Sequence, residues 1–447
     1  MLTSSIHKTS TAKLYATPVK LIALTGVSIV ITLFINYLLA DQVSPEQYGA
    51  WRLFLMFTSF SGLFHFGFTD GVTIQWLFKD SVEWKKCAKR DFLYLIIQQL
   101  VMYGLVIVLV RSGIYPQART SSVAVLVANQ IILQNVSGLL QSLFNRNHNF
   151  YYGPLLTLFS QAVFLVGVIA YSIDYTKSLD LILLSNIQLV VSMIPMLYLA
   201  FKETEDWTAI QQKDLYLSSI LKNIRRSIGF GLPILLAGLL FLGFQHIDKL
   251  LIAGLYPARQ FGFYAFAATL LNVCLTVIFS VANFMMQTIA PYRSTVEIFY
   301  NKAVFFILLL ITPLLFSVVF LQLLMPRFLP NYLESVVYIR YLAGFIGPYV
   351  LVQLIQFSVF KLLNKQRLFL TLAVIFFVLS LSVEYILAKS QVPLTVIALS
   401  SALMAYGWFA AGDWLLCRIK PECKPKQKKR YLFMFATICL YLLINLF

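Results

Sequence analysis

The sequence predicts an all-α integral membrane protein in which about twelve transmembrane helices form two parallel six-helix bundles. Three observations lead to this fold class. The chain is 60% hydrophobic and only 12% charged, whereas soluble domains are roughly 45–50% apolar and about 25% charged. Long apolar runs recur along the whole sequence, and a short motif near the N-terminus returns in the second half.

Each long apolar run is predicted to cross the membrane as a helix. A span needs about 20 apolar residues to cross the hydrocarbon layer, and it must satisfy its own backbone amides because lipid offers no hydrogen bonds. We predict twelve spans, at residues 19–40, 51–78, 92–110, 123–144, 151–173, 181–201, 228–251, 261–290, 303–325, 336–360, 368–388 and 394–416. A last apolar tract, 431–447, is at the short limit for crossing; we expect a thirteenth span, with a position in the membrane interface as the alternative.

The distribution of basic residues predicts a cytoplasmic N-terminus. Lys and Arg accumulate in short loops on the cytoplasmic side of membrane proteins. With the N-terminus inside, most of the 35 Lys and Arg residues fall in cytoplasmic segments, the largest groups being 79–90, 202–226 and 418–430. This bias and attraction to anionic inner-leaflet lipids explain the net charge of +17, so nucleic-acid binding is a poor explanation for it.

Two connections between spans carry the same motif, which predicts an internal repeat. The letters QYG end at Gly49 and QFG end at Gly262, an offset of 213 residues. Six spans separate the copies, so both enter the membrane in the same direction. This predicts pseudo-two-fold symmetry about the membrane normal, with a central cavity between the halves. The predicted domains are an N-terminal bundle (1–201), a cytoplasmic linker (202–226), a C-terminal bundle (227–417) and a basic segment plus a further helix (418–447).

Polar residues at helical spacing mark the faces that we expect to line this cavity. A helix surrounded by lipid should carry none, whereas a helix facing water carries a stripe with a period of 3.6 residues. The predicted stripes are Arg52, Ser59 and Asp70 in the second span; Gln130, Gln134, Ser137, Gln141 and Asn145 in the fourth; Asn272, Thr276, Asn283 and Gln287 in the eighth; and, more weakly, Ser185, Gln188 and Ser192 in the sixth.

Two of these stripes coincide with the repeat. The offset of 213 places Ser59 on Asn272 and Asp70 on Asn283, which scattered polar residues would rarely do. The alternative for any single residue is a hydrogen bond to a neighbouring helix, which contributes about 0.6 kcal/mol on average.

Carboxylates inside spans are candidate gating or coupling groups. An acidic side chain there costs a few kcal/mol or more unless it is paired or hydrated. We expect Asp70 and Asp248 to have such a role, with Asp248 exchanging partners, among them Lys249 and His246, between inward-open and outward-open states. A permanent ion pair of Asp248 with Lys249 is the alternative.

Three arginines near span ends, Arg52, Arg146 and Arg340, are candidate phosphate contacts, because guanidinium matches the geometry of phosphate. Long basic side chains at such positions also extend to the interface without any ligand, which is the alternative for each. Glu384, near the end of the eleventh span, is expected to have a structural role and to reach water beside Lys389, and His65 is expected to pack.

Glycine and proline predict interruptions in two spans. The stretches GFGLP (229–233) and GFIGPY (344–349) should free backbone carbonyls that protein or water must cover. Such breaks suit bending during alternating access, and static kinks are the alternative. The five cysteines form no CxxC pair, so neither a disulfide nor zinc is indicated. No Walker-type loop is present. We expect no cofactor, with H⁺, Na⁺ or the membrane potential as candidate energy sources.

The stretches YLLADQVSPEQYGAW, FGFTDG and HIDKLLIAGLYPARQFGFYAFA resemble the oligosaccharide-lipid flippases of the multidrug/oligosaccharidyl-lipid/polysaccharide exporter superfamily. The resemblance implies transfer of an undecaprenyl-diphosphate-linked glycan from the inner to the outer leaflet of the bacterial inner membrane, for O-antigen, capsule or exopolysaccharide synthesis. It also implies partners: membrane lipids and polysaccharide polymerase or chain-length proteins.

Three other classes compete with this interpretation. An ion-coupled multidrug or organic-cation antiporter of the same superfamily would suit Asp70 and Asp248, although amide-rich stripes fit sugars better. A flippase for lipid-linked peptidoglycan precursors usually has fourteen spans and a strongly cationic cavity. An enzyme would need a catalytic loop or domain outside the membrane, whereas the predicted outer loops are short.

Overall fold

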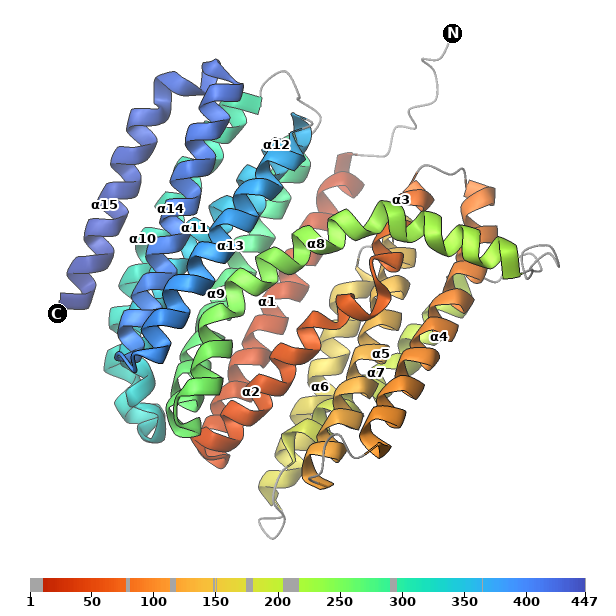
Figure 1. Ribbon diagram of the computed structural model, residues 1–447. Coiled ribbons are helices and arrows are strands. Elements are labelled where there is room, and N and C mark those ends of the chain that lie inside the picture. Colours follow the sequence, from red (N-terminus) through yellow and green to blue (C-terminus); the bar gives the residue numbers. More distant parts are fainter. Residues whose placement is uncertain are drawn as a thin grey trace. The chain divides into compact units, whose positions relative to one another are not determined.

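The computed structural model describes residues 11–77, 81–112, 118–147, 149, 151–173, 180–203, 217–289, 296–363 and 365–446. Every regular element in these ranges is a helix (Figure 1). The first half contains α1 (Thr11–Gln42), α2 (Pro45–Ser59), the 3₁₀-helix η1 (Phe60–His65), α3 (Phe68–Leu77), α4 (Ser81–Arg111), α5 (Ala118–Arg146), α6 (Tyr152–Ile173) and α7 (Leu181–Glu203).

The second half contains helices of similar length. They are α8 (Leu217–Leu255), α9 (Ala258–Ile289), α10 (Val296–Phe328), η4 (Pro330–Tyr332), α11 (Glu334–Val350), the π-helical turn η5 (Leu351–Gln356), α12 (Phe357–Leu362), α13 (Gln366–Lys389), α14 (Leu394–Ile419), η6 (Pro421–Lys426) and α15 (Gln427–Leu446).

The predicted fold class is confirmed. Among the described residues, nine helical segments are long and apolar enough to cross a membrane, and each coincides with one predicted span. They correspond to the first, third to seventh and tenth to twelfth spans. The total number of spans and the symmetry stay predictions.

The chain packs into two compact units. Unit 1 comprises Met1–Ile35 and Phe57–Leu236, and unit 2 comprises Asn36–Met56 and Ala237–Phe447. In unit 1, α5 packs against α4 and α7, and α7 packs against α6. In unit 2, α11 packs against α9, α10 and α14, and α15 lies beside α10 (Figure 1). The domain bounds predicted above stay a prediction beside this division.

The core of unit 2 is dense in aromatic rings, which bury large apolar surfaces and favour offset or edge-to-face pairs. Trp408 of α14 lies at its centre, with ring centroids 5.5 Å from Phe241, 4.8 Å from Phe244 and 6.0 Å from Phe376. These contacts pack the part of α8 that belongs to unit 2 against α13 and α14. Polar groups on these helices are therefore enclosed by a tightly packed aromatic core.

The second span is broken, so the prediction of a continuous helix over 51–78 is wrong. After η1, Phe66 and Gly67 adopt positive φ angles of 51° and 78° before α3 begins. The freed carbonyls of this break receive side-chain amides from neighbouring helices, as lipid would require. Gln99 Nε2 donates to Phe64 O at 3.2 Å, and Asn135 Nδ2 donates to Ser61 O at 3.1 Å.

The two Gly/Pro stretches do not end their helices, so the predicted interruptions are not breaks like that of the second span, and a bend at either proline stays a prediction. α8 continues through Pro233 from Leu217 to Leu255, and α11 continues through Pro348 to Val350. The tenth span instead widens into the π-helical turn η5 directly after α11. A proline lacks the N–H for the regular helix bond, and a π-bulge absorbs that defect without ending the helix.

Glycines permit a close crossing of α3 and α8 in unit 1. A Cβ on Gly71 would overlap the carbonyl oxygen of Ser227, and a Cβ on Gly231 would overlap that of Gly67. On each of the two segments the small residues are four positions apart, Gly67 and Gly71 on one and Ser227 and Gly231 on the other. This spacing lets two backbones approach closely, and such close packing favours helix association inside membranes. Gly67 and Gly71 of FGFTDG and Gly231 of GFGLP therefore have a packing role.

The two glycines that align in the repeat touch each other in unit 2. A Cβ built on Gly49 of α2 would lie 3.1 Å from the Cα of Gly262 of α9, and a Cβ on Gly262 would overlap the carbonyl oxygen of Pro45. The repeated motif thus marks one helix crossing to which both copies contribute.

Candidate functional site

The buried carboxylate Asp248 of α8 has two partners inside unit 2. Only 3% of its surface is exposed. Lys249 Nζ lies 3.0 Å from Asp248 Oδ1, and the Tyr264 hydroxyl of α9 donates to Asp248 Oδ2 at 2.6 Å. Lys249 Nζ also donates to the carbonyl of Gln245 at 2.7 Å. A buried charge with such partners is neutralised locally, as its position in a span requires.

Amide and phenol groups extend this cluster across three helices. Gln245 Nε2 donates to Asn272 Oδ1 of α9 at 3.2 Å, and the Tyr349 hydroxyl of α11 donates to Gln245 Oε1 at 3.0 Å. Two residues predicted separately, Asp248 and Asn272, are therefore joined through Gln245. Asn272 itself is half-buried.

Glu384 of α13 adds a second buried carboxylate. It is 1% exposed, so it does not reach water beside Lys389, whereas its burial and hydrogen bonds agree with the expected structural role. Its Oε1 accepts hydrogen bonds from Ser380 at 2.7 Å and from Ser401 of α14 at 3.0 Å. Its Oε2 has no hydrogen-bond partner among the described residues, and its charge interacts with that of Asp248. We refer to Gln245, Asp248, Lys249, Tyr264, Asn272, Tyr349, Ser380, Glu384 and Ser401 as the unit 2 polar network.

Arg52 of α2 also lies in unit 2, where it contacts α9. Both Nε and a terminal nitrogen of its guanidinium donate to the hydroxyl of Thr269, the first at 2.6 Å. The guanidinium carbon lies 5.0 Å from the centroid of the Trp51 ring and 5.5 Å from that of Tyr48. These contacts fix a half-buried cation. Its phosphate-binding role stays a prediction.

The stripe predicted along the second span does not exist as one line. Arg52 and Ser59 lie on the continuous helix α2, whereas the break at Phe66 separates both from Asp70 in α3. A rotation of 100° per residue holds only within a continuous helix. Asp70 lies in the first turn of α3, where the helix dipole stabilises an anion.

The stripe on α5 is retained because that helix is continuous. Gln130 is buried, Gln134 and Ser137 are half-buried, and Gln141 and Asn145 are exposed on the surface of unit 1. Gln130 Oε1 has no hydrogen-bond partner among the described residues. The face therefore changes from buried to accessible along the helix, and its role in transport stays a prediction.

The weaker stripe on α7 is used for helix packing, and the expectation that it faces water is wrong. Ser185 and Ser192 are buried and donate to carbonyls of their own helix, at 2.8 Å to Leu181 and 2.9 Å to Leu189. Gln188 donates to the Ser160 hydroxyl of α6 at 2.9 Å. The alternative stated for single polar residues, a hydrogen bond to a neighbouring helix, therefore applies to Gln188.

The remaining predicted residues occupy separate places. Arg146 donates to the carbonyl of Trp76 at 3.0 Å, which caps the C-terminal end of α3. Arg340 is half-buried, and its Nε has no hydrogen-bond partner among the described residues. His246 is half-buried beside Asp248 and Lys249. The side chains of Asn283 and Gln287 lie outside the described residues.

His65 has a structural role in the break of the second span, as expected. Its Nδ1 accepts the backbone N–H of Gly67 at 3.1 Å, and the side chain is buried. Among the described residues, no three His, Cys, Asp or Glu side chains group closely enough to hold a metal ion.

Sequence reasoning missed a second buried ion pair in unit 2. Asp413 of α14 and Arg430 of α15 are both 0% exposed and lie 2.7 Å apart. The Tyr300 hydroxyl of α10 donates to Asp413 at 2.7 Å. A signal was present, because an acidic residue inside the apolar run 394–416 needs a partner.

Comparisons with known proteins agree with this architecture. The sequence matches the family described as polysaccharide biosynthesis protein over residues 38–336. No curated protein matches the sequence. Among solved structures, the lipid II flippase MurJ in an inward closed conformation is similar with a TM-score of 0.65 and 14% identity, covering 95% of this chain and 97% of MurJ.

Two further structures share the fold. An inward-facing multidrug resistance MATE family transporter of the MOP superfamily gives a TM-score of 0.64 at 13% identity, covering 88% of this chain and 96% of that one. A MOP superfamily transporter from Pyrococcus furiosus gives 0.59 at 14% identity, covering 90% and 97%. The fold is thus that of MOP superfamily transporters, and the chain belongs to the polysaccharide biosynthesis protein family.

Proposed function

We propose that the protein is a flippase that moves a polyprenyl-diphosphate-linked oligosaccharide from the inner to the outer leaflet of the bacterial inner membrane. One observation carries the proposal: a polysaccharide biosynthesis family match covers most of a chain that has the fold of flippases and transporters. The product serves surface polysaccharide synthesis, and the glycan lipid passes to a polymerase or chain-length partner.

The physical task explains why polar faces are needed. An ionised headgroup faces a Born cost of tens of kcal/mol in bare hydrocarbon, whereas a polar route lets sugars and phosphates cross while the lipid tails stay in the bilayer. Gln134, Ser137, Gln141 and Asn272 supply neutral hydrogen-bonding groups suited to sugar hydroxyls. With the N-terminus inside, outward movement of an anion gains about 2.3 kcal/mol per charge per 100 mV.

Asp248 is the proposed coupling group. Its partners Lys249 and Tyr264 come from two helices, and Glu384 lies within electrostatic range. Protonation of Asp248 or binding of Na⁺ would weaken its pair with Lys249 and favour another arrangement of these helices. The protein would thus alternate between inward-open and outward-open states without ATP and without catalysing a covalent reaction.

Reconstitution in proteoliposomes tests the flippase assignment. A short-chain polyprenyl diphosphate carrying a fluorescent glycan is incorporated in both leaflets, and a membrane-impermeant quencher is added outside. The protein should make nearly all fluorophores accessible, whereas empty liposomes leave about half protected. Equal rates with and without protein would contradict the assignment.

Charge substitutions at the coupling pair test the mechanism. Asp248→Asn should slow flipping by roughly 5- to 150-fold, the range of typical coupling energies. The double variant Asp248→Asn, Lys249→Met removes both charges and so relieves the unpaired ammonium. If the pair is merely structural, the double variant should regain wild-type flipping. Continued loss in a stable double variant supports coupling.

The alternative function is ion-coupled antiport of organic cations. It is favoured by the similarity to MATE family transporters and by two buried carboxylates in unit 2, Asp248 and Glu384. Proton-driven uptake of ethidium into the same vesicles, without flipping of the glycan lipid, would establish this alternative.

A further inference from the structure

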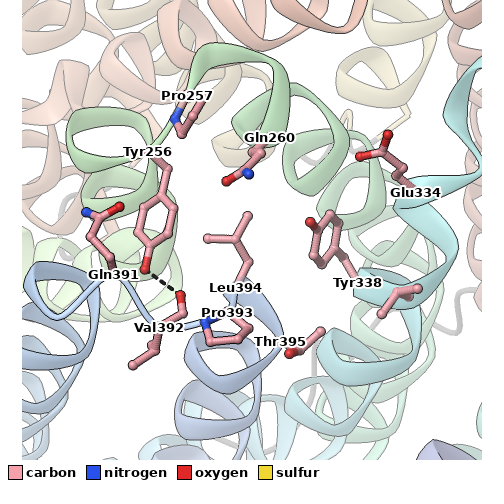
Figure 2. Close-up of a pocket in the computed structure, with 11 residues that line it drawn as sticks. Tyr256, Pro257, Gln260, Glu334, Tyr338, Gln391, Val392, Pro393, Leu394 and Thr395 are labelled. Atoms are coloured by element: carbon pink, nitrogen blue, oxygen red, sulfur yellow. Dashed lines mark hydrogen bonds between the residues drawn. The ribbon is translucent and has the colours of Figure 1, made fainter.

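A cavity of about 570 Å³ opens at one end of unit 2. It lies where α8 meets α9, where α11 begins and where α13 meets α14, and Figure 2 shows its lining. The volume falls within the roughly 300–1,000 Å³ typical of small-molecule sites. The distribution of Lys and Arg predicts that this end of the helices faces the outside.

The lining combines aromatic rings with hydrogen-bonding groups. The rings of Tyr256 and Tyr338 lie on opposite sides of Leu394 in Figure 2. The Tyr256 hydroxyl donates to Val392 O at 2.7 Å, and the Tyr338 ring packs with its centroid 5.6 Å from that of Tyr264. Both rings are therefore held in place, and a fixed aromatic face can stack on the C–H face of a sugar ring.

Gln260 lines this cavity, whereas Gln47, its counterpart in the first copy of the repeat, caps a helix. In the first copy of the repeat, Gln47 Oε1 accepts from Ser44 N at 3.2 Å and Ser44 Oγ accepts from Gln47 N at 3.3 Å. This is a capping box, which occupies the glutamine side chain. In the second copy, Pro257 replaces Ser44 and has neither a backbone N–H nor a side-chain oxygen. The Gln260 amide cannot cap in this way and lines the cavity.

Two further polar groups complete the lining. Gln391 Nε2 donates to Leu255 O at 3.1 Å and to Ala388 O at 3.2 Å, which fixes its amide and leaves Oε1 as the atom to accept from a ligand. The exposed carboxylate of Glu334 lies 3.9 Å from Arg259, too long for a strong pair. Acceptors thus outnumber cations, which disfavours phosphate and favours hydroxyl groups.

We infer that this cavity is a sugar-binding subsite on the outer side of unit 2. It holds an uncharged, hydroxyl-rich sugar of the glycan after the headgroup has crossed, with Tyr256 and Tyr338 stacking on the ring and Gln260 and Glu334 bonding its hydroxyls. This inference rests on the proposed flippase function. Occupancy of the subsite would hold the glycan outside and oppose its return.

Saturation-transfer NMR on the full-length protein in nanodiscs tests the subsite. The probes are free disaccharides built from glucose, galactose, rhamnose or N-acetylglucosamine. Tetramethylammonium serves as a cationic probe. At least one disaccharide should receive saturation from the wild type. Gln260→Ala and Glu334→Gln should each weaken its binding by about 3- to 10-fold, as expected for one lost hydrogen bond.

Asn331→Ala is the matched control, because Asn331 is an exposed amide in η4 that does not line the cavity. It should bind like the wild type. No saturation of any disaccharide, equal binding by the variants, or preference for tetramethylammonium would overturn the inference. The vesicle assay separates the two proposals: flipping without sugar binding rejects the subsite alone, and sugar binding without flipping rejects the flippase function alone.

Discussion

At the scale of single residues, the ion pair of Asp413 and Arg430 is a fully buried polar constraint in unit 2. Arg430 Nε and a terminal nitrogen donate to the two oxygens of Asp413 at 2.7 and 3.2 Å. Arg430 also bonds Asn301 and donates to the carbonyl of Cys423 at 3.2 Å. Because guanidinium stays charged in proteins, this pair must remain complete when α15 is docked.

Removing one partner of this pair should destabilise the protein. Asp413→Asn leaves a buried, uncompensated guanidinium, and we expect the free energy of unfolding to fall by about 3–5 kcal/mol. Replacing both residues by apolar ones, as in Asp413→Leu with Arg430→Met, should cost less. Thermal unfolding of the purified variants measures both effects.

The control for this experiment is Glu422→Gln at the neighbouring pair with Lys420, which is 3.2 Å long and has a largely exposed carboxylate. Surface pairs contribute about 0–1 kcal/mol, so this variant should unfold like the wild type. A loss equal to that of Asp413→Asn would show that burial does not set the difference.

At the scale of elements, two features distinguish unit 1 from a simple bundle of straight helices. α3 crosses α8 with backbones in direct contact at Gly71 and Gly231. The break between α2 and α3 is stabilised by amides from α4 and α5, and these amides also bond each other, with Asn135 Nδ2 3.0 Å from Gln99 Oε1. Both features depend on side chains that cannot be enlarged or made apolar without loss.

The helix crossing predicts opposite results for two glycines of α8. Gly231→Ala places a Cβ against the carbonyl of Gly67, whereas the space around Gly229 is open. We expect Gly231→Ala to lower the thermal midpoint. Gly229→Ala should leave the midpoint unchanged or raise it, because alanine favours the helix by up to about 1 kcal/mol relative to glycine. Similar midpoints for the two variants would mean that α3 and α8 do not touch.

The break in the second span predicts a cost for removing its amide partners. Asn135→Leu leaves the carbonyl of Ser61 and the Oε1 of Gln99 without the donor that Asn135 supplies, and a buried unsatisfied group costs about 1–3 kcal/mol. Gln141→Leu changes an exposed amide on the same helix and serves as the control. Unfolding in a mild detergent series should separate the two variants. Equal stability would indicate a continuous second span.

At the scale of the whole molecule, α15 determines on which side the chain ends. The helix Gln427–Leu446 has 20 residues, which gives about 30 Å at 1.5 Å per residue, enough to cross the hydrocarbon layer. It packs beside α10 and α14, and its basic first turn, residues 427–430, is the end of the group 418–430 that is predicted to be cytoplasmic.

Reporter fusions test this arrangement. With a cytoplasmic N-terminus and a crossing α15, alkaline phosphatase joined after Phe447 should be active, and the same enzyme joined after Lys426 should be inactive. A fluorescent protein that matures only in the cytoplasm should give the reverse pattern. A fluorescent fusion at Phe447 would place α15 in the inner interface.

The sequence by itself determined the class of fold and the positions of most spans. Nine predicted spans coincide with helices that can cross a membrane. A run of about 20 apolar residues, which a span requires, can be recognised from the local composition alone. The sequence also singled out Gly49 and Gly262, which touch in the structure, and it selected Asp248 and Asn272 as candidates through the rarity of polar groups in spans.

Only the tertiary structure decided which polar groups meet. The break after Ser59, the burial of Glu384 and the pairing of Asp413 with Arg430 all depend on contacts between different helices. Inside a membrane a polar group must find its partner within the protein, and that partner is fixed by helix packing. Local composition therefore reveals that a partner is needed, and the packed helices determine which residue it is.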